Sequence, residues 1–241
     1  QLMSISKNQV KVITSLSQKK YRQKHKLFIA EGIKVVNELL NSSFEIDSLF
    51  AVDNFITDVS VDKIIRISEK DLQKISNLKT HNKVLGIFKI PDEIPLQING
   101  VTIALDAIND PGNLGTIIRL CDWFGIASLV CSQDTVDCYN SKVLQATMGS
   151  IARINISYTD VPLFLQRNIL PVYGSFMTGA SVYKSEFPKK GILVMSNEGK
   201  GISDAIKQFC SHSISVPQYG KFTTESLNVG TASAILLNEI R

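Results

Sequence analysis

Two hydrophobic patterns alternate in the N-terminal part of the chain. Apolar side chains recur every three or four positions in three segments, which predicts helices over residues 9–23, 33–40 and 71–76. Short apolar runs between these segments predict strands over residues 27–30, 44–52, 63–67 and 84–90. The N-terminal part is therefore predicted to be a small α/β module.

Two prolines and two acidic residues interrupt this pattern at Pro91–Pro95. Proline-rich polar segments between periodic regions are typical of linkers. We therefore expect one domain over residues 1–92 and a second over residues 97–241.

Beyond the linker, apolar runs alternate with helical patterns. The runs predict strands over 101–105, 128–131, 154–157, 172–176, 192–195 and 212–216. The helical patterns lie over 116–124, 141–146, 161–168 and 226–239. Several of the strands are largely apolar, which favours a parallel sheet covered by helices on both faces. The expected fold class is α/β.

Composition supports a folded core, because 44% of the 241 residues are hydrophobic and 20% are charged. No run approaches the length of about 18 apolar residues that predicts a membrane-spanning helix, and we expect no secretory signal. The spacing of Cys121, Cys131, Cys138 and Cys210 does not suit metal ligands, so no metal site is expected. Reduced thiols in a cytoplasmic protein are the expectation.

The modest net charge of +4 is unevenly distributed. Residues 1–96 hold 15 basic and 11 acidic residues, whereas residues 97–241 hold 11 of each. The first 26 residues contain seven basic residues and no acidic one. Such a patch could be a solvated helix face, but without acidic partners it favours contact with a polyanion such as nucleic acid. The candidate RNA-binding residues are Lys19, Lys20, Arg22, Lys24 and Lys26.

Three loops that follow predicted strands have the composition of ligand-binding segments. They span residues 109–115, 196–201 and 217–228, at the strand ends where open parallel sheets bind ligands. Their glycine spacing matches neither the dinucleotide fingerprint nor the P-loop, which argues against a nucleotide-dependent oxidoreductase and against triphosphate hydrolysis. Each polar residue in these loops, taken singly, could be an ordinary capping or surface residue.

Taken together and in order, the three loops resemble the signature motifs of the SpoU/TrmH-type RNA 2′-O-ribose methyltransferases. The motifs are Asn-Asp-Pro-Gly-Asn-Leu-Gly-Thr-Ile-Ile-Arg (109–119), Leu-Val-Met-Ser-Asn-Glu-Gly-Lys-Gly-Ile-Ser (193–203) and Val-Pro-Gln-Tyr-Gly-Lys-Phe-Thr-Thr-Glu-Ser-Leu-Asn-Val-Gly (216–230). The segments 19–22 and 28–32 look like the accessory RNA-binding domain of many members, which is similar to ribosomal protein L30e. The resemblance covers nearly the whole chain.

This resemblance implies an α/β catalytic domain of SPOUT type with a deep trefoil knot, beside a small L30e-like substrate-binding domain. It implies S-adenosylmethionine as the methyl donor and ribosomal RNA, first of all 23S-type, or transfer RNA as the substrate. It also implies a homodimer formed through the C-terminal domain.

The resemblance further implies a site, residue by residue. The catalytic positions are Asn113, Arg119, Glu198, Ser226 and Asn228. The cofactor positions are Met177, Thr178, Gly179, Ser196, Asn197, Gly199, Val216 and Leu227. Two residues depart from the family pattern, Ser196 where many members have Gly and Gly230 where many have Ser. Both are small, so cofactor binding is still expected.

No histidine lies in the three loops, and a guanidinium group stays protonated. We therefore expect Arg119 to hold a phosphate beside the target ribose and to lower the pKa of the 2′-hydroxyl electrostatically. Glu198 or Ser226 would relay the proton. Asn113 and Asn228 would fix the loop geometry and orient the hydroxyl.

Two alternatives stay open at this point. A knotted methyltransferase could modify a base instead of the ribose, although the motif Ser226-Leu227-Asn228 favours the ribose. A non-catalytic RNA-binding or ribosome-assembly factor could retain the same fold, although the intact motif residues argue against it. Nucleoside analysis would separate the first alternative, and a test of S-adenosylmethionine binding the second.

Overall fold

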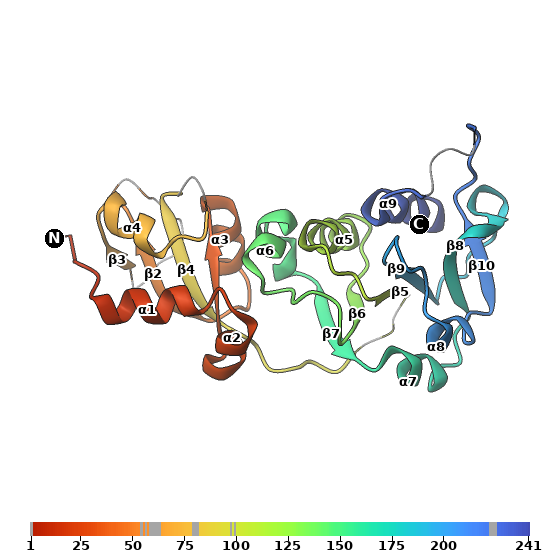
Figure 1. Cartoon of the computed structure of the whole chain (residues 1–241), viewed down its shortest axis with the longest axis horizontal. Helices are drawn as coiled ribbons and strands as arrows, with labels where there is room; N and C mark the ends of the chain where they lie inside the picture. The colour runs from red at the N-terminus through yellow and green to blue at the C-terminus, as the bar shows by residue number, and fades with distance from the viewer. Residues whose placement is uncertain are drawn as a thin grey trace. The chain divides into compact units, whose positions relative to one another are not determined.

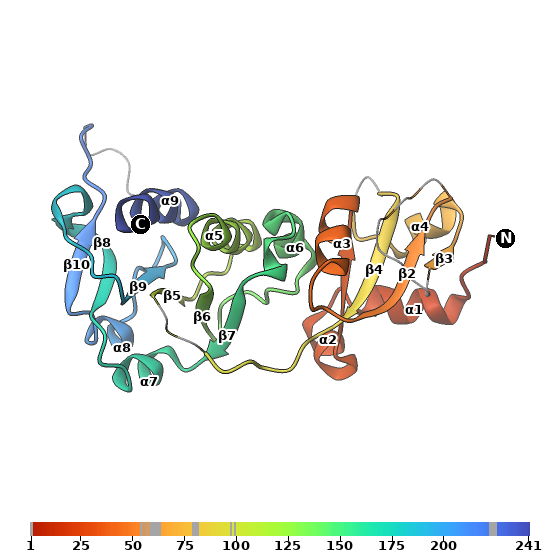
Figure 2. The same cartoon turned by 180° about the vertical axis from the view of Figure 1, so that it is seen from behind.

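The structure is a computed structural model that describes residues 2–53, 55, 57, 64–78, 82–96, 98, 100–221 and 226–241. It divides into two compact units (Figure 1, Figure 2). The first comprises Gln1–Asp92 and Asp137–Ala152, and the second comprises Glu93–Val136 and Arg153–Arg241. Each unit contains a sheet of its own.

The first unit is built on a four-stranded sheet in the order β1–β4–β2–β3. β4 pairs antiparallel with both β1 and β2, and β2 pairs parallel with β3. The strands are β1 (Leu27–Glu31), β2 (Ile46–Ala51), β3 (Ile64–Arg66) and β4 (Val84–Lys89). They fall where short apolar runs predicted strands, and position 63, the predicted start of β3, lies outside the described residues.

The single helix predicted near the N-terminus is in fact two helices, α1 (Lys7–Ser15) and α2 (Lys19–His25). Leu16 and Ser17 form the corner between them, and Nη1 of Arg22 donates to both of their carbonyl groups, at 2.9 and 2.8 Å. These bonds provide hydrogen-bond partners for the two carbonyl groups at the corner. The prediction was wrong because the buried Leu16 continues the hydrophobic spacing across the corner, so the spacing does not reveal the turn.

The two other predicted helices of this unit are present as α3 (Ile33–Leu40) and α4 (Glu69–Ile75). α4 begins two residues earlier than predicted, because the Ser68 hydroxyl caps it by accepting from the Asp71 amide at 3.1 Å.

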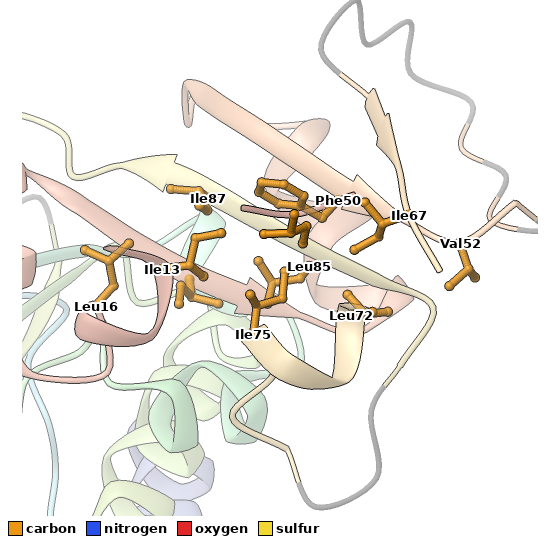
Figure 3. Close-up of a cluster of buried hydrophobic side chains, with 11 residues drawn as sticks. Ile13, Leu16, Phe50, Val52, Ile67, Leu72, Ile75, Leu85 and Ile87 are labelled. Atoms are coloured by element: carbon orange, nitrogen blue, oxygen red, sulfur yellow. The ribbon is translucent and has the colours of Figure 1, made fainter. Parts of the chain in front are cut away.

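The helices α1 and α4 and the sheet enclose one hydrophobic cluster (Figure 3). α1 contributes Ile13, α4 contributes Leu72 and Ile75, and the strands contribute Phe50 and Leu85. All five side chains are at most 3% exposed. Burial of each such side chain stabilises the fold by about 1.5–3 kcal/mol. The first unit therefore has a core of its own.

A segment from the middle of the chain, Asp137–Ala152, belongs to the first unit, although it lies beyond the predicted boundary at residues 92–97. Nε and Nη2 of the buried Arg22 donate to Asp137 Oδ2 at 2.9 and 2.6 Å. The Tyr139 ring packs on Phe28 with 4.6 Å between ring centroids. Removing one partner of a buried ion pair costs about 3–5 kcal/mol, so the Arg22–Asp137 pair is a strong anchor for this segment.

The helix of this segment, α6 (Ser141–Thr147), packs beside β1. Its Gln145 side chain donates to the main-chain carbonyl of Glu31 at 2.7 Å. The Glu31 carboxylate in turn accepts from the Ser76 hydroxyl at 2.5 Å and from the Asn77 amide at 2.8 Å. Burial raises the pKa of the Glu31 carboxyl, and these two hydrogen bonds oppose that rise. The end of β1 therefore holds two segments that are distant in sequence.

The second unit contains a six-stranded sheet in the order β10–β8–β9–β5–β6–β7. Every neighbouring pair is parallel, which confirms the predicted parallel sheet. The strands are β5 (Val101–Asp106), β6 (Ser128–Ser132), β7 (Asn155–Thr159), β8 (Val172–Ser181), β9 (Gly191–Ser196) and β10 (His212–Ser215). β5 and β6 are wholly buried and β9 nearly so, as their largely apolar sequences predicted.

Helices cover both faces of this sheet (Figure 1). α5 (Pro111–Trp123) and α9 (Val229–Ile240) lie side by side on one face. α7 (Val161–Gln166) and the unpredicted short helix α8 (Asp204–Lys207) lie on the other (Figure 2). The carboxyl ends of the parallel strands are therefore left at one edge of the sheet, between the two helical layers.

Two helices at this edge begin at other residues than the hydrophobic spacing predicted. α5 starts at Pro111, five residues before its predicted start at Thr116, because Asp110 caps it and Pro111 suits its first position. α9 starts at Val229, three residues after its predicted start at residue 226, because the side chain of Asn228 is its N-cap. The cap residues, more than the apolar stripe, determine where these helices begin.

No helix among the described residues has the length and hydrophobicity needed to cross a membrane. Within the same residues, no cluster of three or more His, Cys, Asp and Glu side chains could hold a metal ion. The four cysteines form no disulfide, and burial raises the pKa of the Cys121 thiol to about 12.

Candidate functional site

A cavity of about 780 Å³ opens in the second unit at the carboxyl-end edge of its sheet. Its walls are the segments that follow β9 and β10, part of β8 and the start of α9. The described lining residues are Ser175, Phe176, Met177, Thr178, Met195, Ser196, Asn197, Glu198, Gly201, Ile202, Val216, Pro217, Gln218, Gly220, Lys221, Ser226, Leu227, Val229 and Ala232. Most of the wall is apolar, with a small number of polar groups, as is typical of small-molecule sites.

One wall is an excursion of β8 out of its ladder. Ser213 of β10 pairs with Gly174, and the next residue of β10 pairs with Ala180, so residues 175–179 leave the pairing. The Ser213 hydroxyl donates to the Thr178 carbonyl at 3.1 Å, and the Ser215 hydroxyl donates to the Gly179 carbonyl at 3.2 Å. β10 therefore holds the excursion in place against the cavity.

The three sequence motifs meet at one carboxylate oxygen. Glu198 Oε1 accepts from the Val229 amide at 2.7 Å and from the Asn113 side-chain amide at 3.2 Å. Val229 is the first residue of α9, where an N–H group has no partner within the helix and negative charge is stabilised by the helix dipole. One oxygen of Glu198 thus connects the β9 loop to both α5 and α9.

Asn228 completes this network. Its side-chain amide donates to Asn113 Oδ1 at 2.8 Å, and its own Oδ1 accepts from the Gly230 and Thr231 amides at 3.0 and 3.2 Å. The main-chain amide of Asn113 donates to the Asp110 carboxylate at 2.8 Å. Asn113, Glu198 and Asn228 therefore form a continuous hydrogen-bonded group, and both asparagines are oriented by backbone contacts as well.

The structure brings together most of the residues that were candidates for catalysis. Glu198 and Ser226 line the cavity, and Asn113 and Asn228 are bonded to Glu198 or to each other. Arg119 is exposed, lies six residues beyond Asn113 on α5 and is absent from the described lining. Its guanidinium has no hydrogen-bond or ion-pair partner among the described residues, which leaves it accessible to an anionic ligand.

Six of the eight candidate cofactor residues line the cavity, and two do not. The six are Met177, Thr178, Ser196, Asn197, Val216 and Leu227. Gly199 is exposed, and its amide donates to Asn197 Oδ1 at 2.8 Å, so it shapes the loop. Gly179 permits a close approach of strands, because a Cβ there would lie 2.8 Å from the main-chain carbonyl carbon of Ser213.

Gly230, which departs from the family pattern, faces α5. A Cβ at this position would lie 3.1 Å from Cγ2 of Thr116 and 3.1 Å from Oδ1 of Asn228. The branched side chain of Thr116 therefore occupies part of the space that a serine at position 230 would need. Glycine at position 230 therefore suits the limited space beside Thr116.

Four of the five candidate RNA-binding residues are exposed on the first unit. They are Lys19, Lys20, Lys24 and Lys26. Lys20 Nζ lies 4.8 Å from the centroid of the Tyr21 ring, which stacks with His25. Arg22 is 2% exposed and is bound to Asp137, so the prediction that it contacts RNA is not supported. Charge alone did not distinguish this buried cation from its exposed neighbours.

Several of the lining residues were not among the predicted site residues. Ser175 and Phe176 come from the β8 excursion, and Gln218 and Lys221 come from the segment after β10. The loop that holds the last two was predicted to bind a ligand on the rule for parallel sheets, but no role was assigned to either residue. The excursion itself follows from strand pairing over a long sequence separation, which no local pattern reports.

Two family models match the chain. Residues 100–238 match the model described as the SpoU rRNA methylase family. Residues 7–86 match the model described as an MRM3-like substrate binding domain. The first match covers more than half of the chain and includes all three motif loops.

Two curated relatives are named as 2′-O-methyltransferases of 23S ribosomal RNA. A 23S rRNA (guanosine(2553)-2′-O)-methyltransferase of Bacillus subtilis (strain 168) is 30% identical over 249 residues, covering 100% of this chain and 99% of the relative. A 23S rRNA (guanosine-2′-O-)-methyltransferase of Neisseria meningitidis serogroup B is 29% identical over 170 residues, covering 68% of this chain and 64% of the relative.

Solved structures match the whole chain. A TrmH-family protein of Porphyromonas gingivalis matches with a TM-score of 0.90 and 34% identity, covering 99% of each chain. An rRNA methyltransferase of Sinorhizobium meliloti, solved with S-adenosylmethionine bound, matches with a TM-score of 0.86 and 28% identity. That match covers 100% of this chain and 96% of the Sinorhizobium chain.

Replacing Gly179 by Ala is expected to destabilise the second unit by about 1–3 kcal/mol, because the added methyl group would force β8 and β10 apart. The matched control is Gly220→Ala, where a Cβ meets no atom within 4 Å. Chemical denaturation of both variants measures the difference. Equal free energies of unfolding would contradict the close-approach role of Gly179.

Proposed function

The chain belongs to the SpoU rRNA methylase family, and we propose that it transfers a methyl group from S-adenosylmethionine to a ribose 2′-hydroxyl of 23S-type ribosomal RNA. The observation that carries this proposal is the cavity lined by the second and third motif loops, whose lining residue Glu198 is hydrogen-bonded to Asn113 of the first motif and to the start of α9. The curated relatives named above support ribosomal RNA as the substrate class and the ribose oxygen as the acceptor.

The cavity fits S-adenosylmethionine. Its volume of about 780 Å³ lies within the usual range for small-molecule sites. Apolar side chains such as Met177, Ile202 and Leu227 can contact the adenine ring, and Thr178 and Asn197 offer polar groups for the ribose or the amino-acid end. When bound, the cofactor supplies a methyl group on a positively charged sulfur, which makes the methyl carbon electrophilic.

The protein must then hold the target ribose and help its 2′-hydroxyl lose a proton. Arg119 is suited to bind the phosphate beside that ribose, because its guanidinium is exposed and permanently charged. Placed there, it would stabilise the developing negative charge on the 2′-oxygen. We assign Arg119 this electrostatic role and not that of a base.

Glu198 is our candidate for the proton acceptor. It is the one carboxylate among the described lining residues, and the two hydrogen bonds described above involve its Oε1 alone. Ser226 lines the same cavity and can relay the proton. Asn113 and Asn228 hold Glu198 and the start of α9 in position.

We propose that residues 1–92 bind the RNA substrate and that residues 97–241, apart from the segment 137–152 that packs in the first unit, form the catalytic domain. The resemblance implies an L30e-like fold for the former and a trefoil knot in the latter. The exposed lysines of the first unit support the first assignment, because phosphate groups attract such patches. The motif loops, which all belong to the second unit, support the second. A cytoplasmic location is consistent with ribosomal RNA as the substrate and with four cysteines that form no disulfide.

We also propose that the protein is a homodimer formed through its C-terminal domain. Trp123 at the end of α5 is 83% exposed, which is unusual for so large an apolar side chain. A second copy that covers α5 and α9 would bury it.

Incubation with labelled S-adenosylmethionine and unmodified 23S ribosomal RNA is expected to yield a labelled 2′-O-methyl nucleoside after digestion. Arg119→Ala is expected to lower turnover by about 100-fold or more while S-adenosylmethionine binding stays near that of the wild type. Mass spectrometry of nucleosides and calorimetry measure the two effects.

The matched control is Arg167→Ala, which removes an exposed arginine at the end of α7 on the opposite helical layer. Label on a base, or no label with the cofactor bound and ribosomal RNA supplied, would contradict the proposed reaction. Loss of cofactor binding in Arg119→Ala would mean that Arg119 is structural.

Reversing two charges on α2, Lys19→Glu with Lys20→Glu, is expected to weaken RNA binding and to flatten its salt dependence. The slope of log K against log salt is negative, and each lost phosphate contact makes it shallower by about 0.7–0.9. Lys189→Glu with Lys190→Glu changes the net charge equally at exposed positions of the second unit. If both pairs reduce the slope alike, the patch on α2 has no special role.

Trp123→Arg is expected to convert a dimer into a monomer, as measured by sedimentation equilibrium. Ile169→Arg is the control, because Ile169 is a fully exposed apolar residue that lies after α7. Trp123 is the one tryptophan of the chain, so its fluorescence should shift to shorter wavelength as the wild type associates. A monomeric wild type at assay concentrations would disprove the dimer.

A further inference from the structure

Asp106 stands out as a buried charged group next to the cavity that has no place in the motif-derived site. It is the last residue of β5, the central strand next to β9, and it is 7% exposed. Its register partner is Ser196, the last residue of β9. Asp106 is absent from the described lining of the cavity, so a direct contact with a ligand is not its role. A carboxylate buried in this way must be engaged by hydrogen bonds.

The hydrogen bonds of Asp106 go to both ends of one loop. Its main-chain carbonyl accepts from the Asn197 amide at 3.2 Å, and its carboxylate Oδ2 accepts from the Ser203 amide at 2.7 Å. The loop that runs from Asn197 to Ser203 therefore begins and ends on the same residue. Ser203 is also the N-cap of α8, and its own side chain makes no capping hydrogen bond there.

The loop is compact between these two attachments. The Gly201 amide donates to the Asn197 carbonyl at 2.9 Å, and the Gly199 amide donates to the Asn197 side chain at 2.8 Å. Gly201 has a φ of +68°, which glycine adopts without strain. Because these bonds close the loop on itself, fixing its two ends determines where its remaining residues lie.

This loop carries functional groups of the proposed site. Asn197, Glu198, Gly201 and Ile202 all line the cavity. Glu198 is also the residue that connects α5 and α9. A group that holds the loop thus acts on the cofactor pocket and on the catalytic network at once.

We propose that Asp106 is a positioning residue for S-adenosylmethionine binding, which it supports by holding the ends of the 197–203 loop through its main-chain carbonyl and its carboxylate. This inference rests on the proposed function, because it names the cofactor that the loop would bind. The acceptor oxygen matters in this role, whereas a negative charge at position 106 is not required. Asp106→Asn keeps a side-chain oxygen that can accept from the Ser203 amide, and Asp106→Ala does not.

Calorimetry with S-adenosylmethionine is the first measurement. Asp106→Ala is expected to bind the cofactor about tenfold or more weakly, in line with the loss of a hydrogen bond to a charged acceptor. Asp106→Asn is expected to bind within about threefold of the wild type, because a neutral acceptor loses only part of that interaction. In methyl-transfer assays the Ala variant should raise KM for S-adenosylmethionine more than it lowers kcat.

Amide hydrogen exchange provides a second readout that needs no ligand. In Asp106→Ala, peptides that cover residues 197–203 should exchange faster, while those of β6 and β7 should be unchanged. The matched control is Thr102→Ala, which alters another buried polar residue of β5 at the opposite end of the strand. It should leave both exchange in the loop and cofactor binding as in the wild type.

The outcomes separate the two proposals. A wild-type protein that binds no S-adenosylmethionine refutes the proposed function, and exchange in the 197–203 loop then still decides whether Asp106 holds it. Wild-type-like binding and exchange in Asp106→Ala would overturn the positioning role. Equal loss of binding in the Asn and Ala variants would overturn it as well, because charge and not the hydrogen bond would then be responsible.

Discussion

One carboxylate oxygen, Glu198 Oε1, connects the parts of the proposed site. It accepts from the first amide of α9 and from the Asn113 side chain of α5, while Glu198 itself belongs to the loop after β9. A parallel sheet makes this meeting possible, because it places the ends of its strands at one edge. The amide at the start of α9 and the half-buried Glu198 carboxylate then serve as hydrogen-bond partners for each other. Without this contact, the loop after β9 would lose its hydrogen bonds to α5 and α9, and only the bond between Asn228 and Asn113 would still join two of the motifs.

The first unit shows how burial decides the role of a charge. Arg22 and the lysines around it belong to one basic run, and composition treats them alike. The structure buries Arg22 against Asp137 and leaves Lys20 and Lys24 exposed. A planar guanidinium can satisfy an aspartate and two carbonyl groups at once, which makes arginine suited to the buried position. The exposed lysines stay available for a polyanion.

Several elements were predictable from local pattern, and others were not. The largely apolar runs of β5, β6 and β9 correctly predicted buried parallel strands, and the motif order led to the SpoU family, which the comparisons confirm. The break between α1 and α2 was missed, because Leu16 preserves the hydrophobic spacing through the corner. The early start of α5 was also missed, although Asp110 before Pro111 is a recognisable cap signal.

The sequence by itself determined the alternation of strands and helices, the basic N-terminal run and the identity of the motif residues, because each depends on neighbours in the chain. The tertiary structure decided which of these residues meet. Asn113 bonds to a residue 85 positions away and to another 115 positions away. Arg22 likewise binds Asp137 across 115 positions, which assigns a central segment to the first unit. Contacts over such separations depend on packing and strand order, and periodicity within a short window carries no information about either.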